Sequence, residues 1–156
     1  MTNMNHKPTA ARHAARERAL QALFQLDLNH ADDASQATMY ETLAIDTALG
    51  EAEPPLNERG RAYMEALVKG TRAHLAEIDE LIQKSSKDWK VGRMAGVDRN
   101  LCRMAAWEMY FAEEKLEPGV AINEAVELAK KYGTDDASRY VNGILGAMTR
   151  LGEAES

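Results

Sequence analysis

The sequence predicts an all-α protein. Apolar residues recur at helical spacing along nearly the whole chain, and no segment shows the strict polar–apolar alternation of a half-buried strand. The 156 residues suit one domain, and a hydrophobic share of 45% with a charged share of 28% is typical of a globular protein. We therefore expect helices joined by short connections.

The first helix is expected from about residue 9, behind Pro8, to about residue 28. Its apolar side chains follow the i, i+3, i+4 spacing of one buried face. Arg12 and Arg16 continue this stripe toward the N-terminus, so we expect them at the rim where the helix leaves the core. The expected face consists of Ala19, Leu20, Ala22, Leu23, Phe24, Leu26 and Leu28.

Residues 29–56 form an acidic segment whose structure the pattern defines least. Ser35 can cap a short helix that ends near Gly50, and Pro54-Pro55 then interrupts the chain. Asn57 is expected to cap a helix that ends near residue 70, followed by a helical segment to about residue 84. The inward side chains of these two helices are Tyr63, Met64, Leu67 and Val68, and then Leu75, Ile78, Leu81 and Ile82.

The connection between residues 85 and 96 holds two large side chains, Trp89 and Met94, which we expect to anchor back onto the core. The helix that follows, at about residues 97–112, differs from the others because it is apolar nearly all round. Such a helix is usually the buried centre of a bundle. Its Cys102, the only cysteine, is expected to be a buried thiol in a reducing compartment.

Two further helices complete the pattern. Glu117-Pro118-Gly119 is expected to form a turn, and the next helix ends at Gly133, a predicted left-handed C-cap. Thr134 or Asp135 is expected to cap the last helix. The inward residues are Ile122, Ala125, Val126 and Ala129, and then Tyr140, Val141, Ile144, Leu145 and Met148.

Two glycines, Gly143 and Gly146, lie inside the last expected helix. Glycine there costs about 1 kcal/mol relative to alanine. We therefore expect a neighbouring backbone to approach the helix closely at these positions.

The net charge of −6 is unevenly distributed. Residues 1–26 hold four cationic side chains against one acidic one, whereas residues 29–56 hold six acidic side chains and no Lys or Arg. A basic end beside an acidic segment can orient a polyanion, although chance clustering on a solvated surface explains the charges equally well.

Nothing in the sequence predicts catalysis, a metal or a cofactor. The histidines are scattered, and neither a phosphate-binding glycine loop nor a Gly-x-Ser-x-Gly motif occurs. The pair Asp135-Asp136 more often serves the helix dipole than a metal. No apolar run is long enough to span a membrane, and the N-terminus lacks the apolar core of a secretion signal, so we expect a non-enzymatic cytoplasmic protein.

Three segments resemble the NusB family. Residues 15–26 (ARERALQALFQL) are similar to the opening helix of the family, and residues 97–109 (VDRNLCRMAAWEM) to its central buried helix. The most specific match is VAINEAVELAKKYG at residues 120–133, followed by YVNGIL at residues 140–145. Together they relate the chain to the family from about residue 8 to residue 151, apart from the acidic segment.

The resemblance implies a NusB-like fold of about seven helices in two three-helix subdomains packed across each other. The domain would cover residues 9–152, with subdomains at about 9–84 and 89–151 and the break near Ser85. Residues 1–8 would be a flexible basic tail and residues 153–156 a second tail.

The resemblance also implies a function. Members of the family pair with the ribosomal protein NusE, and the pair binds single-stranded boxA RNA in the RNA polymerase antitermination complex during ribosomal RNA synthesis. The same domain is fused to some ribosomal RNA cytosine methyltransferases, but a chain ending at Ser156 leaves no room for that enzyme, so we expect the free factor.

By the resemblance, a basic N-terminal segment contacts RNA, here Lys7, Arg12, His13 and Arg16. His13 and Ala14 stand where arginines are common in the family, so RNA binding can depend on the partner. The other interpretation of the arginines is a solvated helix start, although cations there oppose the helix dipole and gain nothing from it.

Tyr140 lies, by the resemblance, where an aromatic ring meets RNA, and base stacking on such a ring is worth about 1–3 kcal/mol. Asp136, Arg139 and Asn142 lie within about one helical turn and would position phosphate or base edges. The alternative is that Tyr140 belongs to the core stripe of the last helix. Lys130 and Lys131 are more simply explained as partners of Glu127.

For the protein partner, the resemblance points to Phe24 and Asp98. Phe24 is otherwise a core ring, and Asp98 otherwise caps its own helix. Two alternatives to the RNA-binding factor stay open: an all-α protein–protein scaffold without RNA contact, and a homodimer.

Overall fold

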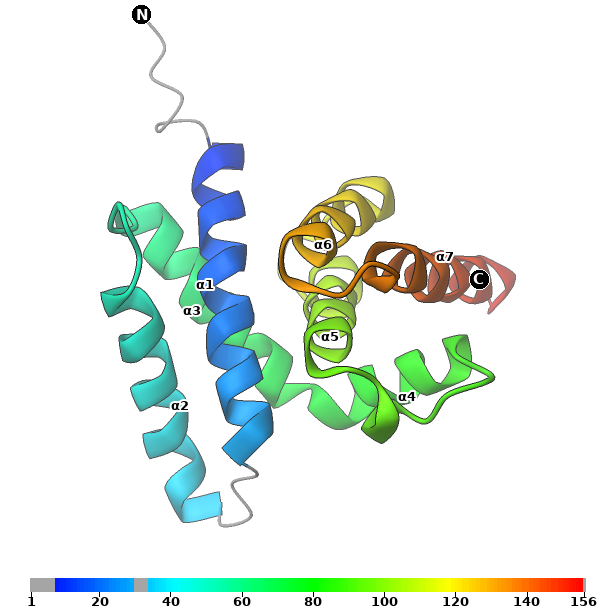
Figure 1. Cartoon of the computed structure of the whole chain (residues 1–156), viewed down its shortest axis with the longest axis horizontal. Coiled ribbons are helices and arrows are strands. Elements are labelled where there is room, and N and C mark those ends of the chain that lie inside the picture. The colour runs from blue at the N-terminus through cyan, green and yellow to red at the C-terminus, as the bar shows by residue number, and fades with distance from the viewer. Residues whose placement is uncertain (1–7, 30–33, 156) are drawn as a thin grey trace, which may run out of the picture. The chain divides into compact units, whose positions relative to one another are not determined.

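The computed structural model describes residues 8–29 and 34–155, so Lys7 and the predicted basic tail lie outside the described residues. These residues form seven α-helices and a 3-10 turn without any strand, which confirms the all-α prediction (Figure 1). The helices are α1 (Pro8–Asn29), α2 (Ala34–Gly50), α3 (Glu58–Ala73), α4 (Leu75–Ser85), α5 (Gly96–Tyr110), α6 (Pro118–Tyr132) and α7 (Ala137–Glu155), with the 3-10 turn η2 at Val91–Arg93.

The chain divides into two compact units, Met1–Lys69 and Gly70–Ser156, which we call the N-terminal and C-terminal units. The resemblance places the break near Ser85, about one helix later. The division falls earlier because α4 packs on α5 and α7. A bidentate pair reinforces this packing: Arg103 of α5 donates from Nε and Nη2 to the carboxylate of Asp79 on α4, over 2.8 and 2.9 Å.

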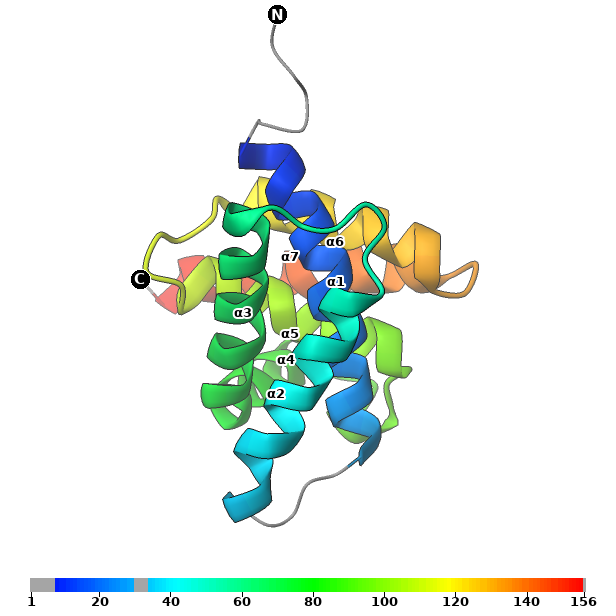
Figure 2. The same ribbon diagram turned by 90° about the vertical axis from the view of Figure 1, so that its left-hand side faces the viewer.

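In the N-terminal unit, α2 runs alongside α1 (Figures 1 and 2). The start of α3 is fixed as the sequence predicts: the Gly60 amide donates to Oδ1 of Asn57 over 2.8 Å, which satisfies an otherwise unpaired amide of the first turn. A side-chain hydrogen bond from Gln21 of α1 to Glu51 ties the end of α2 to α1. The buried apolar residues of this unit include Ala15, Ala19, Leu20, Ala22, Leu23, Leu26, Ala44, Ile45, Ala48, Met64, Leu67 and Val68.

In the C-terminal unit, α5 is the centre of the packing, with α4, α6 and α7 against it. Its residues from Asn100 to Met109 are all buried, as its all-round apolar pattern predicts. Cys102 is a free, fully buried thiol. Burial, and then the nearby charge of Asp98, raise the pKa of that thiol well above its ordinary range, so it stays protonated.

Several local predictions were wrong. Leu28 is 61% exposed because it lies at the end of α1, beyond the buried stripe. Ser35 lies inside the first turn of α2, and Pro118 with Gly119 lies in the first turn of α6, where proline is tolerated because its missing N–H would be unpaired.

The glycine predictions also need correction. Gly133 ends α6 with an extended backbone, φ −93° and ψ −177°, and not in the left-handed region. It is glycine for lack of space: a Cβ there would lie 2.4 Å from Cβ of Ala137. Among the described residues, nothing lies within 4 Å of a Cβ built on Gly143, and only the flexible end of Arg150 approaches Gly146, so neither has the predicted close neighbour.

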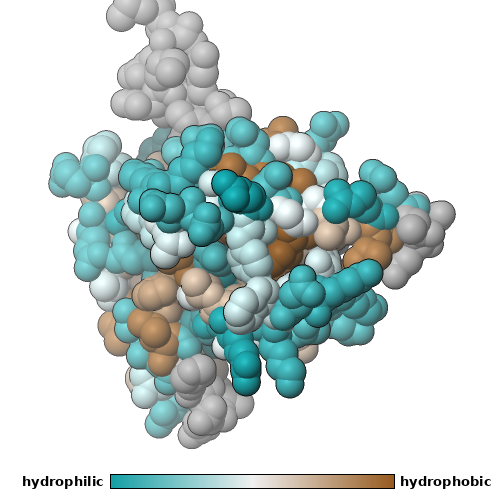
Figure 3. All heavy atoms as spheres, turned by 45° about the vertical axis from the view of Figure 1, so that its right-hand side comes forward, coloured by the Kyte–Doolittle hydropathy of each residue, from teal (hydrophilic) through white to brown (hydrophobic). Residues whose placement is uncertain are grey.

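The connection between α4 and α5 divides its two predicted anchors. Met94 is buried, but Trp89 is 53% exposed. The face drawn in Figure 3 is mostly hydrophilic, and its apolar residues gather in a few separate patches. The large hydrophobic residues exposed in the described part of the chain are Leu28, Met39, Leu43, Trp89, Val120, Tyr132 and Leu151.

Candidate nucleic-acid interface

The basic start of α1 is held against an aromatic ring of α3. The guanidinium carbons of Arg12 and Arg16 lie 5.0 and 5.6 Å from the ring centre of Tyr63. Arg16 is only 4% exposed, whereas Arg12 is half-buried. Stacking on an aromatic face stabilises a partly desolvated guanidinium. Arg16 is therefore largely engaged within the fold, and Arg12 is the better placed of the two to meet a phosphate.

His13 and Phe24 lie on the same helix. His13 is half-exposed, and its Nε2 lies 3.9 Å from Oε1 of Glu17, one helical turn later. Phe24 is half-buried. A contact with a protein partner would need an exposed ring, and a core residue would be fully buried, so this intermediate exposure favours neither role. Its role at a protein interface stays a prediction.

The start of α7 presents the second group of predicted residues. Asp136 directly precedes the helix, and its carbonyl accepts a hydrogen bond from the Tyr140 amide over 3.1 Å. Arg139 and Asn142 are exposed, and Tyr140 is half-buried beside the fully buried Val141. Tyr140 therefore borders the core but keeps part of its surface at the solvent.

The lysines near the end of α6 have local contacts. Nζ of Lys130 lies 3.4 Å from Oε1 of Glu127, so the two form the ion pair that the sequence predicts. Lys131 lies over the ring of Tyr132, with its Nζ 5.3 Å from the ring centre. These contacts account for both side chains without a ligand.

Asp98 lies in the first turn of α5 and is buried. Burial raises the pKa of its carboxyl. It does not cap the helix, because the preceding residue is Ala95 and Asp98 is its third residue. The end of α6 comes close to it: a Cβ on Gly133 would lie 3.6 Å from Oδ1 of Asp98.

The connection from Ser86 to Met94 is a feature that the site predictions missed. Its Trp89 is exposed, and so are the cationic Lys87, Lys90 and Arg93. The sequence contains the signal, because Lys87, Lys90 and Arg93 all lie within four residues of Trp89, but the large apolar side chain of the tryptophan predicts burial in the core.

Two searches of the described residues gave negative results. No group of three or more His, Cys, Asp or Glu is placed to hold a metal within residues 8–29 and 34–155. Over the same ranges, none of the helices combines the length and apolar character needed to cross a membrane.

Comparison with known families decides the relationship. The model of the NusB family matches residues 13–150, which include every described candidate residue except Arg12. The chain belongs to the NusB family. The family resemblance of the three segments is thereby confirmed.

Individual NusB proteins support the assignment. The chain is 42% identical, over 143 residues, to the transcription antitermination protein NusB of Pelotomaculum thermopropionicum, covering 92% of each chain. The solution structure of NusB from Aquifex aeolicus matches with a TM-score of 0.75 at 29% identity, covering 94% of this chain and 92% of that one. A crystal structure of antitermination factors NusB and NusE in complex with double-stranded RNA matches with a TM-score of 0.72 at 28% identity, covering 90% and 97%.

Proposed function

We propose that this protein is a cytoplasmic transcription antitermination factor that binds boxA RNA together with the ribosomal protein NusE during ribosomal RNA synthesis. One observation carries the proposal: a NusB chain similar to this one over nearly its whole length forms a complex with NusE and RNA. The relatives named as antitermination proteins point in the same direction.

Each unit offers RNA-binding chemistry of its own. Arg12 and His13 at the start of α1 supply cationic and hydrogen-bonding groups for phosphates. In the C-terminal unit, exposed Arg139 and Asn142 flank Tyr140, whose ring keeps part of its surface at the solvent. The cation of Arg139 can bind a phosphate, and the amide of Asn142 can hydrogen-bond a base edge. The partly exposed ring of Tyr140 can stack on a base. Phe24 and Asp98 are the proposed contacts for NusE.

The RNA in the similar complex is double-stranded, whereas we propose an unpaired strand for this protein. Tyr140 favours the unpaired form because only a base outside a duplex can lie face to face with a side-chain ring. A fluorescence-anisotropy titration, with and without NusE, should therefore give a lower dissociation constant for a boxA-type single strand than for the same sequence in a duplex.

Arg139 and Arg150 provide a matched pair of variants because both are exposed arginines of α7. Arg139→Gln should weaken RNA binding and reduce the slope of log K against log salt by about 0.7, the value for one phosphate contact on a single strand. Arg150→Gln should leave the slope unchanged. Equal effects of the two variants would contradict a local contact at Arg139.

The scaffold alternative predicts no RNA binding by the protein or by its complex with NusE. Light scattering over a dilution series tests the homodimer alternative. If RNA fails to bind in both titrations while NusE still binds, the protein acts as a protein–protein scaffold and the proposed function is wrong.

A further inference from the structure

We infer that the connection between α4 and α5 is a second contact for unpaired RNA, in which Trp89 stacks on a base and Lys87, Lys90 and Arg93 bind the flanking phosphates. This inference rests on the proposed RNA-binding function, and it adds a surface that the sequence comparison did not indicate.

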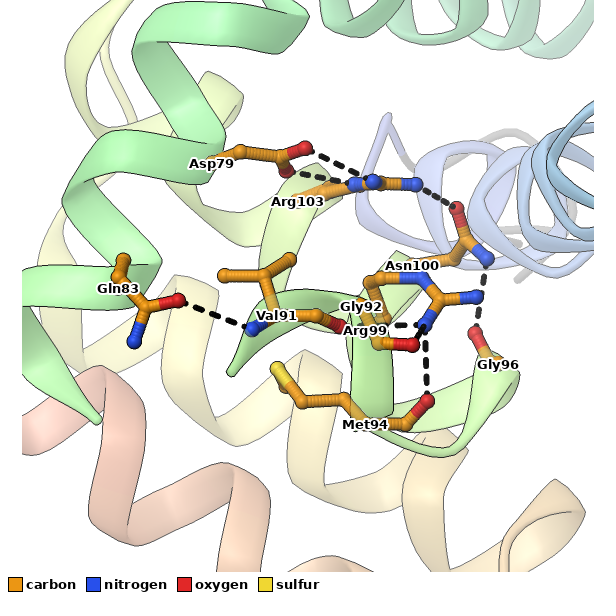
Figure 4. Close-up of polar contacts among 9 residues, drawn as sticks. All are labelled: Asp79, Gln83, Val91, Gly92, Met94, Gly96, Arg99, Asn100 and Arg103. Atoms are coloured by element: carbon orange, nitrogen blue, oxygen red, sulfur yellow. Dashed lines mark hydrogen bonds and ion pairs between the residues drawn. The ribbon is translucent and has the colours of Figure 1, made fainter. Parts of the chain in front are cut away.

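The backbone of this connection is fixed from the α4 side. The Gln83 side chain donates to the carbonyl of Trp89 over 3.1 Å. It also accepts a hydrogen bond from the Val91 amide over 3.0 Å (Figure 4). The Ser86 hydroxyl also donates to the Trp89 carbonyl, over 3.3 Å. The main chain directly after the Trp89 side chain is therefore held by two side chains at and just beyond the end of α4.

It is fixed from the α5 side as well. Nη1 of Arg99 donates to the carbonyls of Val91, Gly92 and Met94 over 3.2, 3.4 and 2.9 Å (Figure 4). Val91 and Met94 are also buried. Because these hydrogen bonds already fix its backbone, the connection loses little conformational freedom when a ligand binds. This is the condition for a pre-organised site.

The exposure of Trp89 is unusual on such a frame. Its neighbours Val91 and Met94 turn into the core, while 53% of the Trp89 residue surface stays exposed. Leaving a large ring in water forgoes hydrophobic stabilisation that burial would supply. An exposed tryptophan on a fixed backbone is accordingly typical of a binding surface.

The charge around Trp89 selects the partner. Residues 87–93 carry three cations and one acid, a local net charge of +2 in a protein of net charge −6. Lys87, Lys90 and Arg93 are all exposed. A flat ring with cations on either side along the chain matches an unpaired strand, whose bases stack and whose phosphates are negative. An acidic protein segment would satisfy the cations but would not require the indole face.

The test is an anisotropy titration of a labelled 15-nucleotide boxA-type single strand into the protein and into its complex with NusE. Trp89→Leu keeps an apolar side chain and removes the ring, so the dissociation constant should rise by about 5- to 150-fold, the range for loss of one base stack. Trp89→Phe keeps a smaller ring and should lose less. Inorganic polyphosphate has charge without bases, so its affinity should not respond to Trp89→Leu.

The cations have their own matched pair. The double variant Lys87→Gln with Lys90→Gln should flatten the salt slope by about 1.4, the value for two phosphates of a single strand. Lys69→Gln with Lys115→Gln removes the same charge from two exposed lysines elsewhere, and it should leave the slope unchanged.

Intrinsic fluorescence supplies a direct readout because the protein has two tryptophans and Trp107 is buried. RNA should quench the emission of the native protein, and Trp89→Phe should abolish the quenching.

If Trp89→Leu leaves RNA affinity unchanged while Arg139→Gln weakens it, the second contact is wrong and the proposed function stands. If Trp89→Leu weakens only NusE binding, the surface belongs to the protein partner and the inference is likewise wrong. If the native protein binds no RNA with or without NusE, both fail.

Discussion

The start of α1 and the connection between α4 and α5 combine the same residue types in opposite ways. On α1, two arginines lie over the ring of Tyr63, and one of them is almost fully buried. In the connection, the aromatic Trp89 is exposed, and its neighbouring cations are exposed too. In the first case the ring is a partner for the cations within the fold. In the second, ring and cations are both presented to the solvent.

The difference teaches that cations near an aromatic residue do not by themselves indicate a binding site. The two regions differ in whether the cations already interact with an aromatic ring inside the protein. Arg16 has a cation–π contact and little exposed surface, so its loss should affect stability first. Trp89 has large exposed surface, so its loss should affect binding first.

The largest expected effect is at Arg103, whose bidentate pair with Asp79 links the two helices on either side of this connection. Arg103→Ala leaves the Asp79 carboxylate without its bidentate partner and should lower the free energy of unfolding by about 3 kcal/mol. That is the lower end of the range for buried pairs, because Asp79 is partly exposed. Chemical denaturation measures the change, and Arg93→Ala, at an exposed arginine of the same connection, should change stability by less than about 0.5 kcal/mol.

The direct test of the comparison is a pair of variants, Arg16→Ala and Trp89→Leu. Arg16→Ala should lower the free energy of unfolding by about 2 kcal/mol, because a desolvated cation–π contact is lost. Trp89→Leu should leave stability within about 0.5 kcal/mol while it weakens RNA binding. Thermal denaturation and anisotropy on the same samples give both values, and the reverse order of effects would contradict the distinction.

A third prediction compares two glycines, Gly143, which has open space around it, and Gly133, which has none. Gly143→Ala should stabilise the protein by about 1 kcal/mol, because a Cβ there meets nothing within 4 Å among the described residues and alanine favours the helix. Gly133→Ala should destabilise it by roughly 1–3 kcal/mol, since the Cβ would overlap Ala137. Denaturant midpoints report both signs. A stabilised Gly143→Ala variant with weaker RNA binding would place RNA close to this part of α7.

The smallest effect concerns Asp98, where charge is buried. Its raised pKa means that the folded protein holds the proton more tightly than the unfolded chain, so the contribution of this group to stability falls as pH rises above its ordinary value of 3.8. Asp98→Asn removes that dependence and should stabilise the protein at pH 7 by on the order of 0.5 kcal/mol. Unfolding measured from pH 4 to pH 7 checks the sign, and NusE affinity should decrease in the same variant.

Much of the fold could be predicted because helical spacing reports directly on burial. The fully buried Met64, Val68, Ile78 and Ile82 were all identified from their periodicity, and Asn57 was identified as a cap from its chemistry. Each of these depends on neighbours within a few residues of the chain. The sequence alone suffices for such features.

The two positions that periodicity describes least well, Trp89 and Arg16, depend on contacts outside the helical repeat. Trp89 is large and apolar, which predicts burial, but the frame built by Gln83 and Arg99 leaves it outside. Arg16 continues the buried stripe of α1, which predicts a position at the rim of the core, but the contact with Tyr63 of another helix helps to bury it almost completely. The helical periodicity of the sequence predicts neither the exposure of Trp89 nor the contact between Arg16 and Tyr63. The roles of Arg139 and Tyr140 came from the family resemblance, and they stay predictions until RNA binding is measured.

The unreactive sulfur of Cys102 makes the protein convenient for labelling. Since this thiol is fully buried and held protonated, maleimide dyes should not modify it in the native state. New cysteines at exposed positions, one on each unit, would then be the sole attachment points. Energy transfer between two such dyes would follow, molecule by molecule, how the two halves respond when RNA is loaded.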